Sequence, residues 1–192
     1  KCMEGIRINI LTFGEHNRCN STHRPVTHFV VQTISHNFTF ADFTDDIALL
    51  KMNRIVQITD TVKPVCLPWN TDNSYVGVNA VAAGWGTVGE GRNYSCYLRE
   101  VEVPVLTNKE CLTGGYTASM ISDDMLCAGY LKEGKKDTCQ WDINGLLMMM
   151  MILIKFILGV VSWGIGCGRP GYPGVYTRVT NYMTWIRDCV CL

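Results

Sequence analysis

Several residues that could do chemistry lie in one short stretch, KDTCQWDINGLLMMMM, at residues 136–151. The stretch contains two carboxylates, Asp137 and Asp142, with Cys139 between them. Acyl transfer by a hydroxyl requires a nucleophile, a base that takes its proton and an acid that orients the base. The residue after Asp142 is Ile143, whose hydrocarbon side chain has neither a proton to lose nor a lone pair for attack. The position directly after Asp142, where a nucleophile would be expected, therefore lacks one.

The composition excludes some functions and indicates an extracellular protein. The 192 residues can form one well-buried domain or two small ones. Seventeen basic residues balance seventeen acidic ones, so there is no basic face of the kind that binds nucleic acid. Ten cysteines without a CxxC pair are typical of a secreted, disulfide-bonded chain. Three glycosylation sequons agree: Asn20-Ser21-Thr22, Asn37-Phe38-Thr39 and Asn93-Tyr94-Ser95.

The chain begins at Lys1, with neither an initiator methionine nor a charged and then apolar leader. We therefore expect a fragment of a longer product, whose signal peptide precedes this segment.

Short runs of β-branched and aromatic residues recur between Gly, Pro, Asn and Asp. They predict strands at residues 7–14, 26–34, 79–88, 100–106, 158–164 and 174–179. This spacing indicates an all-β sandwich or barrel. Two stretches predict helix, one at 107–112 capped by Thr107 or Asn108 and one at 181–190 capped by Asn181. The second has an apolar stripe that we expect to be buried by packing: Tyr182, Trp185, Ile186 and Cys189.

Residues 146–161 allow three interpretations. The first is a membrane span, but a span needs about twenty apolar residues, and Lys155 would lie at its centre. The second, which we favour, is a pair of buried strands joined by an unusually apolar turn. The third is that part of the stretch is not authentic coding sequence.

Six motifs resemble those of the trypsin-like, chymotrypsin-fold serine proteases and follow the family's order. They are DDIALLKM at 45–52, VKPVCLP at 62–68, AAGWGTV at 82–88, MLCAGY at 125–130, KDTCQ at 136–140 and VVSWGIGCGRPGYPGVYTRV at 160–179. The segments GEHNRCN and EVEVPVLTNKEC look especially like the secreted proteases of arthropod cascades.

The resemblance implies an all-β fold of two antiparallel β-barrels and a C-terminal α-helix. We expect one peptidase domain, in which residues 1–66 form the remainder of an incomplete first barrel, 67–180 the second barrel and 181–190 the helix. The segment with the family's catalytic histidine would precede Lys1. The four histidines present are expected to be exposed loop residues or satisfied strand residues: His16, His23, His28 and His36.

The resemblance also implies catalytic roles. Asp46 aligns with the acid that orients the catalytic base, and Ile143 occupies the nucleophile's position. Trp141 replaces a glycine whose backbone N–H contributes to the oxyanion hole. Asp142 aligns with the acid that pairs with the N-terminal amine freed by activation.

The positions implied for substrate binding are better preserved. Asp137 aligns with the acid at the base of the pocket that binds Lys or Arg, while Gly164 and Gly174 match its walls. Ser162, Trp163 and Gly164 match the strand that pairs with the substrate backbone.

By resemblance, Cys111 pairs with Cys127 and Cys139 with Cys167, and Cys19 with Cys96 is a plausible additional bridge. No partner is assigned to Cys2, Cys66, Cys189 or Cys191. Glu15 matches one ligand of a calcium loop found in some relatives, but the partnering carboxylate is missing, so we expect no cofactor and no metal.

Three functional hypotheses follow. In the first, the chain is a trypsin-like endopeptidase domain, specific for Lys or Arg, that is inactive as given because Ile143 replaces the nucleophile and the histidine segment is missing. A retained intron or a frame shift would explain residues 141–157. In the second, it is a secreted non-catalytic homologue that binds a protein partner. In the third, the chain is a degraded gene product that folds poorly. In the first two, the partner is a protein or peptide, not a nucleic acid, and no membrane is involved.

Overall fold

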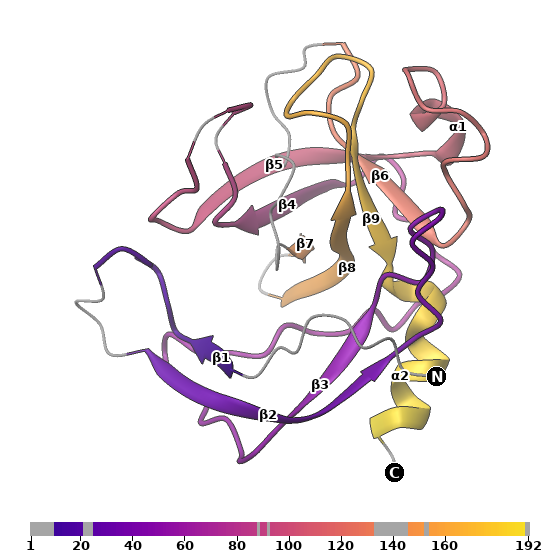
Figure 1. Ribbon diagram of the computed structural model, residues 1–192. Coiled ribbons are helices and arrows are strands. Elements are labelled where there is room, and N and C mark those ends of the chain that lie inside the picture. The colour runs from indigo at the N-terminus through magenta and orange to yellow at the C-terminus, as the bar shows by residue number, and fades with distance from the viewer. Residues whose placement is uncertain are drawn as a thin grey trace.

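The computed structural model describes residues 10–20, 25–87, 89–91, 93–132, 146–151 and 154–190. Most of the described elements are strands (Figure 1). They are β1 (Ile10–Phe13), β2 (Val26–Ser35), β3 (Ala48–Met52), β4 (Asn79–Gly84), β5 (Arg99–Leu106), β6 (Met125–Ala128), β7 (Leu146–Met151), β8 (Ile154–Trp163) and β9 (Gly174–Arg178). The helical elements are α1 (Asn108–Cys111), the 3-10 turn η1 (Val179–Tyr182) and α2 (Met183–Val190).

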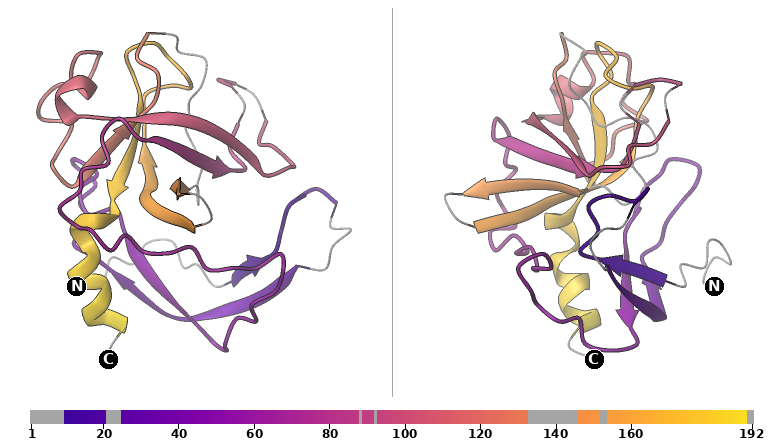
Figure 2. Two further views of the ribbon diagram at one scale, coloured as in Figure 1. Left: turned by 180° about the vertical axis from the view of Figure 1, so that it is seen from behind. Right: turned by 90° about the vertical axis from the view of Figure 1, so that its left-hand side faces the viewer.

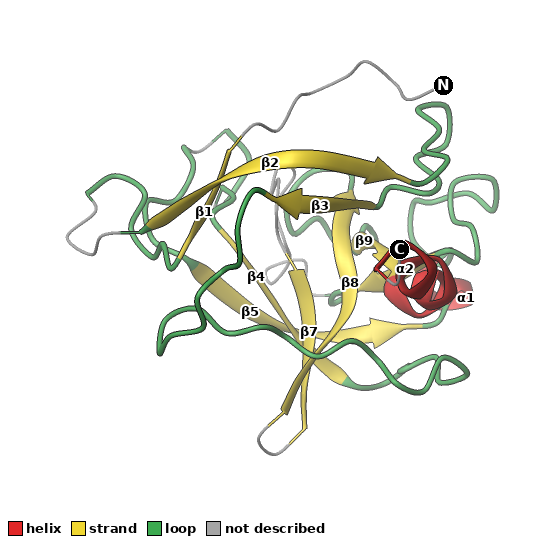
Figure 3. Ribbon diagram, turned by 90° about the horizontal axis from the view of Figure 1, so that it is seen from below, coloured by secondary structure: helices red, strands yellow, loops and turns green. Residues whose placement is uncertain are grey.

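The first three strands form an antiparallel sheet in the order β1-β2-β3. Figure 3 shows β2 and β3 lying side by side along this sheet. The other six strands close into a barrel in the order β4-β5-β6-β9-β8-β7. A mostly β chain with a half-barrel, a full barrel and a C-terminal helix is the fold class that the sequence predicts.

The barrel is closed around alternating apolar residues. In β4, every second side chain from Ala80 onward is buried, and β5 alternates in the same way through Val103 and Val105. Leu126, Leu158 and Tyr176, each at most 1% exposed, come from β6, β8 and β9 and complete this core. Because neighbouring side chains on a strand point to opposite faces, the alternation fixes which face of each strand lines the interior.

The apolar run after residue 145 forms a hairpin with a register shift between Leu147 and Met148. Strands β7 and β8 pair from Leu146↔Val160 to Met151↔Ile154, and β7 also pairs with β4 through Val81↔Met148. The predicted pair of strands is therefore confirmed. Within β8, Phe156 and Leu158 are buried while Lys155 is exposed, which accounts for a charge inside the run. No helix in the described part of the chain is long and apolar enough to cross a membrane.

The C-terminal elements pack against both halves of the molecule. Tyr182, Met183 and Ile186 are buried in one cluster with Ile47 from the first half and Ile157 from β8. Figures 1 and 2 show α2 lying beside the three-stranded sheet and below the barrel. The packing role predicted for this stripe is confirmed for Tyr182 and Ile186, and the helix therefore ties the two halves together.

The structure corrects one predicted cap and confirms the other. Thr107 caps α1, and its hydroxyl accepts from the Glu110 backbone N–H at 3.0 Å while the Glu110 carboxylate accepts from the Thr107 N–H at 2.8 Å. Asn181 is not a helix cap. It lies inside η1, and its side-chain amide donates to the Asp123 carbonyl and to the Asp124 carboxylate, at 3.2 and 2.9 Å. These acceptors from a distant loop replace the local cap.

Tyr182 carries a buried hydroxyl that anchors the loop before β3. The hydroxyl donates to Asp45 Oδ1 at 2.8 Å, and the side chain is 3% exposed. Burial foremost, and then the hydrogen bond to Asp45, hold the pKa of Tyr182 well above its ordinary value.

The raised pKa predicts a stability change in alkaline solution. Below about pH 10, where an unfolded tyrosine stays protonated, the contribution of Tyr182 to stability is fully present; it is lost as the pH rises further. Tyr182→Phe should lower the free energy of unfolding at pH 8 by about 1–3 kcal/mol. In urea titrations from pH 8 to 11, the difference in free energy of unfolding between wild type and Tyr182→Phe should become smaller above about pH 10. The variant Tyr97→Phe, at an exposed tyrosine, serves as the control. A difference in free energy of unfolding that stays constant to pH 11 would contradict a raised pKa of Tyr182.

Candidate functional site

Asp46 lies between the two halves of the molecule and is held by the second barrel. Its Oδ2 accepts a hydrogen bond of 2.7 Å from the Ser162 hydroxyl in β8. Its backbone carbonyl accepts another of 2.8 Å from the Thr177 hydroxyl in β9. Two residues more than a hundred positions away in the chain thus fix both the carboxylate and the backbone of a half-buried acid.

A local irregularity of the barrel aims Ser162 at this acid. The β8–β9 register runs regularly to Val161↔Tyr176 and shifts before Trp163↔Val175. Extra residues of this kind bend a strand and redirect a side chain, and they are common beside functional sites. Ser162 occupies the shifted position and reaches Asp46 instead of continuing the ladder.

The loop that leads to Asp46 has an unusual backbone conformation. Phe43 and Asp45 have positive φ angles of 56° and 58°, in a region that non-glycine residues seldom adopt. Asp45 Oδ1 accepts a hydrogen bond from the Tyr182 hydroxyl and also lies 3.0 Å from His36 Nδ1. The His36 ring in turn meets the Tyr182 and Trp185 rings edge-on, with centroids 5.1 and 5.2 Å away. These contacts stabilise the conformation that points Asp46 toward Ser162.

Three aromatic rings form a wall next to the Asp46–Ser162 pair. Phe43 stacks on Trp163 with centroids 6.1 Å apart, and Trp163 meets Tyr116 edge-on at 5.1 Å. The Tyr116 hydroxyl donates to the Pro173 carbonyl at 2.8 Å, which fixes the far end of the wall. We call Phe43, Trp163 and Tyr116 the aromatic wall.

The sequence analysis identified Trp163 but missed Phe43 and Tyr116. The position of Phe43, three residues before Asp46, was a usable signal, since that spacing places both side chains on one short loop. Tyr116 lies in a polar turn after α1, and no pattern in its own neighbourhood shows that it meets Trp163. That contact depends on the folded barrel.

The two glycines expected at the pocket walls lie at the ends of neighbouring strands. Gly164 directly follows β8, and among the described residues an added Cβ there would meet only the Tyr116 hydroxyl, 4.0 Å away. Gly174 begins β9, is buried and pairs with Ala128. Asp137, Trp141, Asp142 and Ile143 lie outside the described residues, and their implied roles stay predictions.

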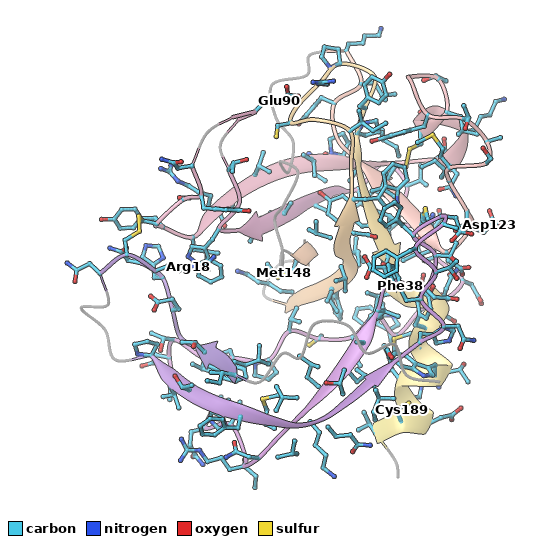
Figure 4. All side chains as sticks on the ribbon, viewed as in Figure 1. Arg18, Phe38, Glu90, Asp123, Met148 and Cys189 are labelled. Carbon is cyan, nitrogen blue, oxygen red and sulfur yellow. A yellow bond between two sulfur atoms is a disulfide. The ribbon has the colours of Figure 1, made fainter. Side chains whose placement is uncertain are left out.

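The segment after Gly164 is tied to a loop of the second barrel. Glu90 accepts from the Cys167 backbone N–H at 3.1 Å and from Arg169 Nη2 at 2.9 Å. The hydrogen bond from Arg169, followed by that from Cys167, holds the pKa of the Glu90 carboxyl below its ordinary value. Figure 4 shows Glu90 at this end of the barrel, away from α2.

The expected disulfides Cys111–Cys127 and Cys19–Cys96 are present. Cys167 is also disulfide-bonded, while its expected partner Cys139 lies outside the described residues. Cys66 and Cys189 are free thiols. Cys2 and Cys191 lie outside the described part of the chain.

The histidines do not complete a catalytic group with Asp46 in the described residues. His16 is exposed, His36 pairs with Asp45, and His23 lies outside the described ranges. His28 corrects the expectation of an exposed or satisfied residue. It is 2% exposed in β2 and packs edge-on against Phe13, and its Nδ1 has no hydrogen-bond partner among the residues that the structure describes. Its position on the inner face of β2 buries it despite its polarity.

Glu15 uses its carboxylate to cap a turn. Its Oε1 accepts from the backbone N–H groups of His16 and Asn17, both at 2.9 Å. Within the described ranges, no group of three or more His, Cys, Asp or Glu side chains could hold a metal ion.

The Asp46–Ser162 hydrogen bond should contribute measurably to stability. A double-mutant cycle of Ser162→Ala and Asp46→Ala, measured by urea unfolding, should give a coupling of about 1.5–3 kcal/mol, as expected for a bond to a charged group. The exposed Thr44–Asp42 bond of 2.8 Å provides a matched control, with an expected coupling below about 1 kcal/mol. Equal coupling energies in the two cycles would show that the Asp46–Ser162 hydrogen bond contributes no more to stability than an exposed one.

Comparisons with known proteins agree with this geometry. The trypsin family model matches residues 1–186. A venom protease of Bombus pensylvanicus is 41% identical over 153 residues, which cover 78% of this chain and 61% of that protein. Trypsin-1 of Astacus astacus is 40% identical over 154 residues, 80% of this chain and 63% of that protein. The proclotting enzyme of Tachypleus tridentatus is 34% identical over 182 residues, 91% of this chain and 48% of that protein.

The chain thus spans less than two thirds of the length of these curated relatives. The ordered motifs, the closed six-stranded barrel and the match over nearly the whole chain lead to one conclusion. This chain belongs to the trypsin family.

Proposed function

We propose that this chain is a trypsin-like endopeptidase domain that does not hydrolyse peptides. The observation that carries the proposal is Ile143, which directly follows Asp142 at the position of the family's nucleophilic serine. Removal of the nucleophile costs the convergent enzyme subtilisin roughly a millionfold in turnover. Trp141, in place of an oxyanion-hole glycine, would cost about 3 kcal/mol more if one N–H donor is lost.

The substrate-binding groups support a retained binding function. Asp137 is proposed to lie at the base of a pocket for a Lys or Arg side chain, between walls that include Gly164 and Gly174. The backbone after Ser162 is proposed to pair with an extended peptide, as exposed strand edges do. The aromatic wall offers an apolar surface next to that strand.

The β7–β8 hairpin favours a non-catalytic homologue over a disrupted protease. An arbitrary apolar insertion has no reason to pair with strands on both sides, whereas β7 pairs with β4 through Leu146–Met148 and with β8 through Leu146–Met151. We therefore propose a secreted protein that binds a protein partner in an extracellular cascade. A relative named proclotting enzyme and another named venom protease support this setting. Nucleic acid and membrane are not proposed as partners.

A chemical test separates inactive from active domains. Purified chain should show no turnover of an arginine ester above the buffer blank, because Ile143 cannot form an acyl-enzyme. It should also resist covalent labelling by a fluorophosphonate probe, with trypsin as the positive control. Turnover that is abolished by that probe would refute the proposal. Sequencing of the spliced transcript over codons 130–165 gives a second check. A serine codon at position 143 would contradict the proposal that the domain does not hydrolyse peptides.

A binding test addresses the retained pocket. Arginine amide should bind the wild-type chain, and Asp137→Asn should weaken the affinity at least tenfold, because the carboxylate that pairs with the guanidinium is lost. Calorimetric titration provides the measurement, and Asp60→Asn, an exposed residue of a connecting loop, is the matched control. Equal affinity for wild type and Asp137→Asn would exclude Asp137 from the pocket, whatever the outcome of the catalytic test.

A further inference from the structure

The sequon Asn37-Phe38-Thr39 lies in the connection that follows β2 and precedes Asp46. Asn37 and Thr39 are both exposed. The Asn37 side-chain amide makes no hydrogen bond to the described part of the chain, and only its backbone carbonyl is used, as an acceptor from the Thr39 hydroxyl at 3.3 Å. An Asn-x-Thr triplet with a free, solvent-facing amide is an acceptor for N-linked glycosylation in a secreted protein.

The backbone on both sides of Asn37 is fixed. The His36 N–H donates to the Ile47 carbonyl at 3.1 Å, and the His36 ring pairs with Asp45. On the other side, the Thr39 N–H donates to the Thr44 carbonyl at 3.1 Å and forms an isolated bridge. A group attached to Asn37 would therefore project from a defined position on the surface.

The surface around Asn37 is aromatic. Phe38 and Phe40 meet edge-on with centroids 4.8 Å apart, and the Phe40 side chain is 69% exposed. Phe43 is 42% exposed on its outer side while it stacks on Trp163. Exposed aromatic residues gathered on one loop are unfavourable in water. The apolar C–H faces of sugar rings could cover them while the sugar hydroxyls face the solvent.

The other two sequons lie elsewhere. Asn20 follows Cys19, and the Asn93 sequon ends just before Cys96, so the Cys19–Cys96 disulfide joins the chain next to Asn20 to the chain next to that sequon. Figure 4 places Arg18, next to this disulfide, and Phe38 on opposite sides of the molecule. A glycan on Asn37 would therefore be the one beside the aromatic wall.

We propose that Asn37 is a site of N-linked glycosylation and that its glycan covers the Phe38–Phe40 pair beside the aromatic wall. The donor class is an oligosaccharide attached to a lipid diphosphate. The Asn37 amide nitrogen forms a bond to the sugar's anomeric carbon and loses one proton. The bond from that carbon to the diphosphate oxygen breaks, the lipid diphosphate leaves with the electron pair, and nothing is oxidised or reduced.

The inference rests on the proposed extracellular location, and the experiment removes that dependence. The full chain is expressed behind an added secretory leader in insect cells, so it enters the glycosylation pathway whatever its natural location. Glycans are then released by an amidase in heavy-oxygen water, which converts each occupied Asn to labelled Asp. Peptide mass spectrometry gives the occupancy of Asn37, and Asn93 is quantified in the same sample. The natural location is tested separately, by detection of the chain in extracellular fluid.

Asn37 should be labelled in most of the secreted molecules. Asn37→Gln and Thr39→Ala should each remove this glycan, while Thr39→Ser, which keeps the sequon, should retain it. Binding of a hydrophobic dye should increase several-fold in Asn37→Gln and stay unchanged in Asn93→Gln, since only the former uncovers Phe40. Asn37 left unlabelled in secreted chains that contain the Cys19–Cys96 disulfide would overturn the site. Unchanged dye binding in Asn37→Gln would overturn the covering role.

Discussion

The fixed position of Asp46 between two independently formed sheets is the constraint on which the rest of the site depends. The acid belongs to the first half of the chain, but Ser162 and Thr177, which hold it, belong to the second. Neither half can place this carboxylate alone, so the site exists only when both are folded and docked. The positive φ of Asp45 is tolerated for the same reason, because Tyr182 and His36 hold its side chain from outside the loop.

Closure of the second barrel and catalysis depend on different residues. Closure of the barrel requires backbone pairing of β7 with β4 and β8, and alternating burial along the strands. A strand ladder accepts methionine as readily as other apolar side chains, so the run at 146–151 leaves the architecture intact. Catalysis instead requires one particular hydroxyl, and Ile143 stands at the position proposed for it. The loss of catalysis that we propose therefore does not require loss of the fold.

The elements that could be predicted from sequence were those whose signals are local. Runs of β-branched and aromatic residues predicted β2, β4, β5 and β9, Thr107 was one of two caps predicted for α1, and ordered motifs predicted the fold. Asn181 was misassigned as a cap because its partners, Asp123 and Asp124, come from a distant loop. The burial of His28 and the contact of Phe43 with Trp163 are likewise long-range. Composition and spacing cannot report contacts between residues that are far apart in the chain.

The Cys19–Cys96 disulfide has a consequence for a chain exposed to other proteases. It joins the loop after β1 to the segment before β5, and it encloses all of β2, β3 and the long strand-free connection that follows. That connection is exposed at Ile55 and Ile58 and contains the Arg54–Ile55 bond, a target for enzymes of trypsin-like specificity. A single cut there would not release either half. The two pieces would stay covalently joined, and α2 would still pack against both, so a nicked molecule can remain one structural unit.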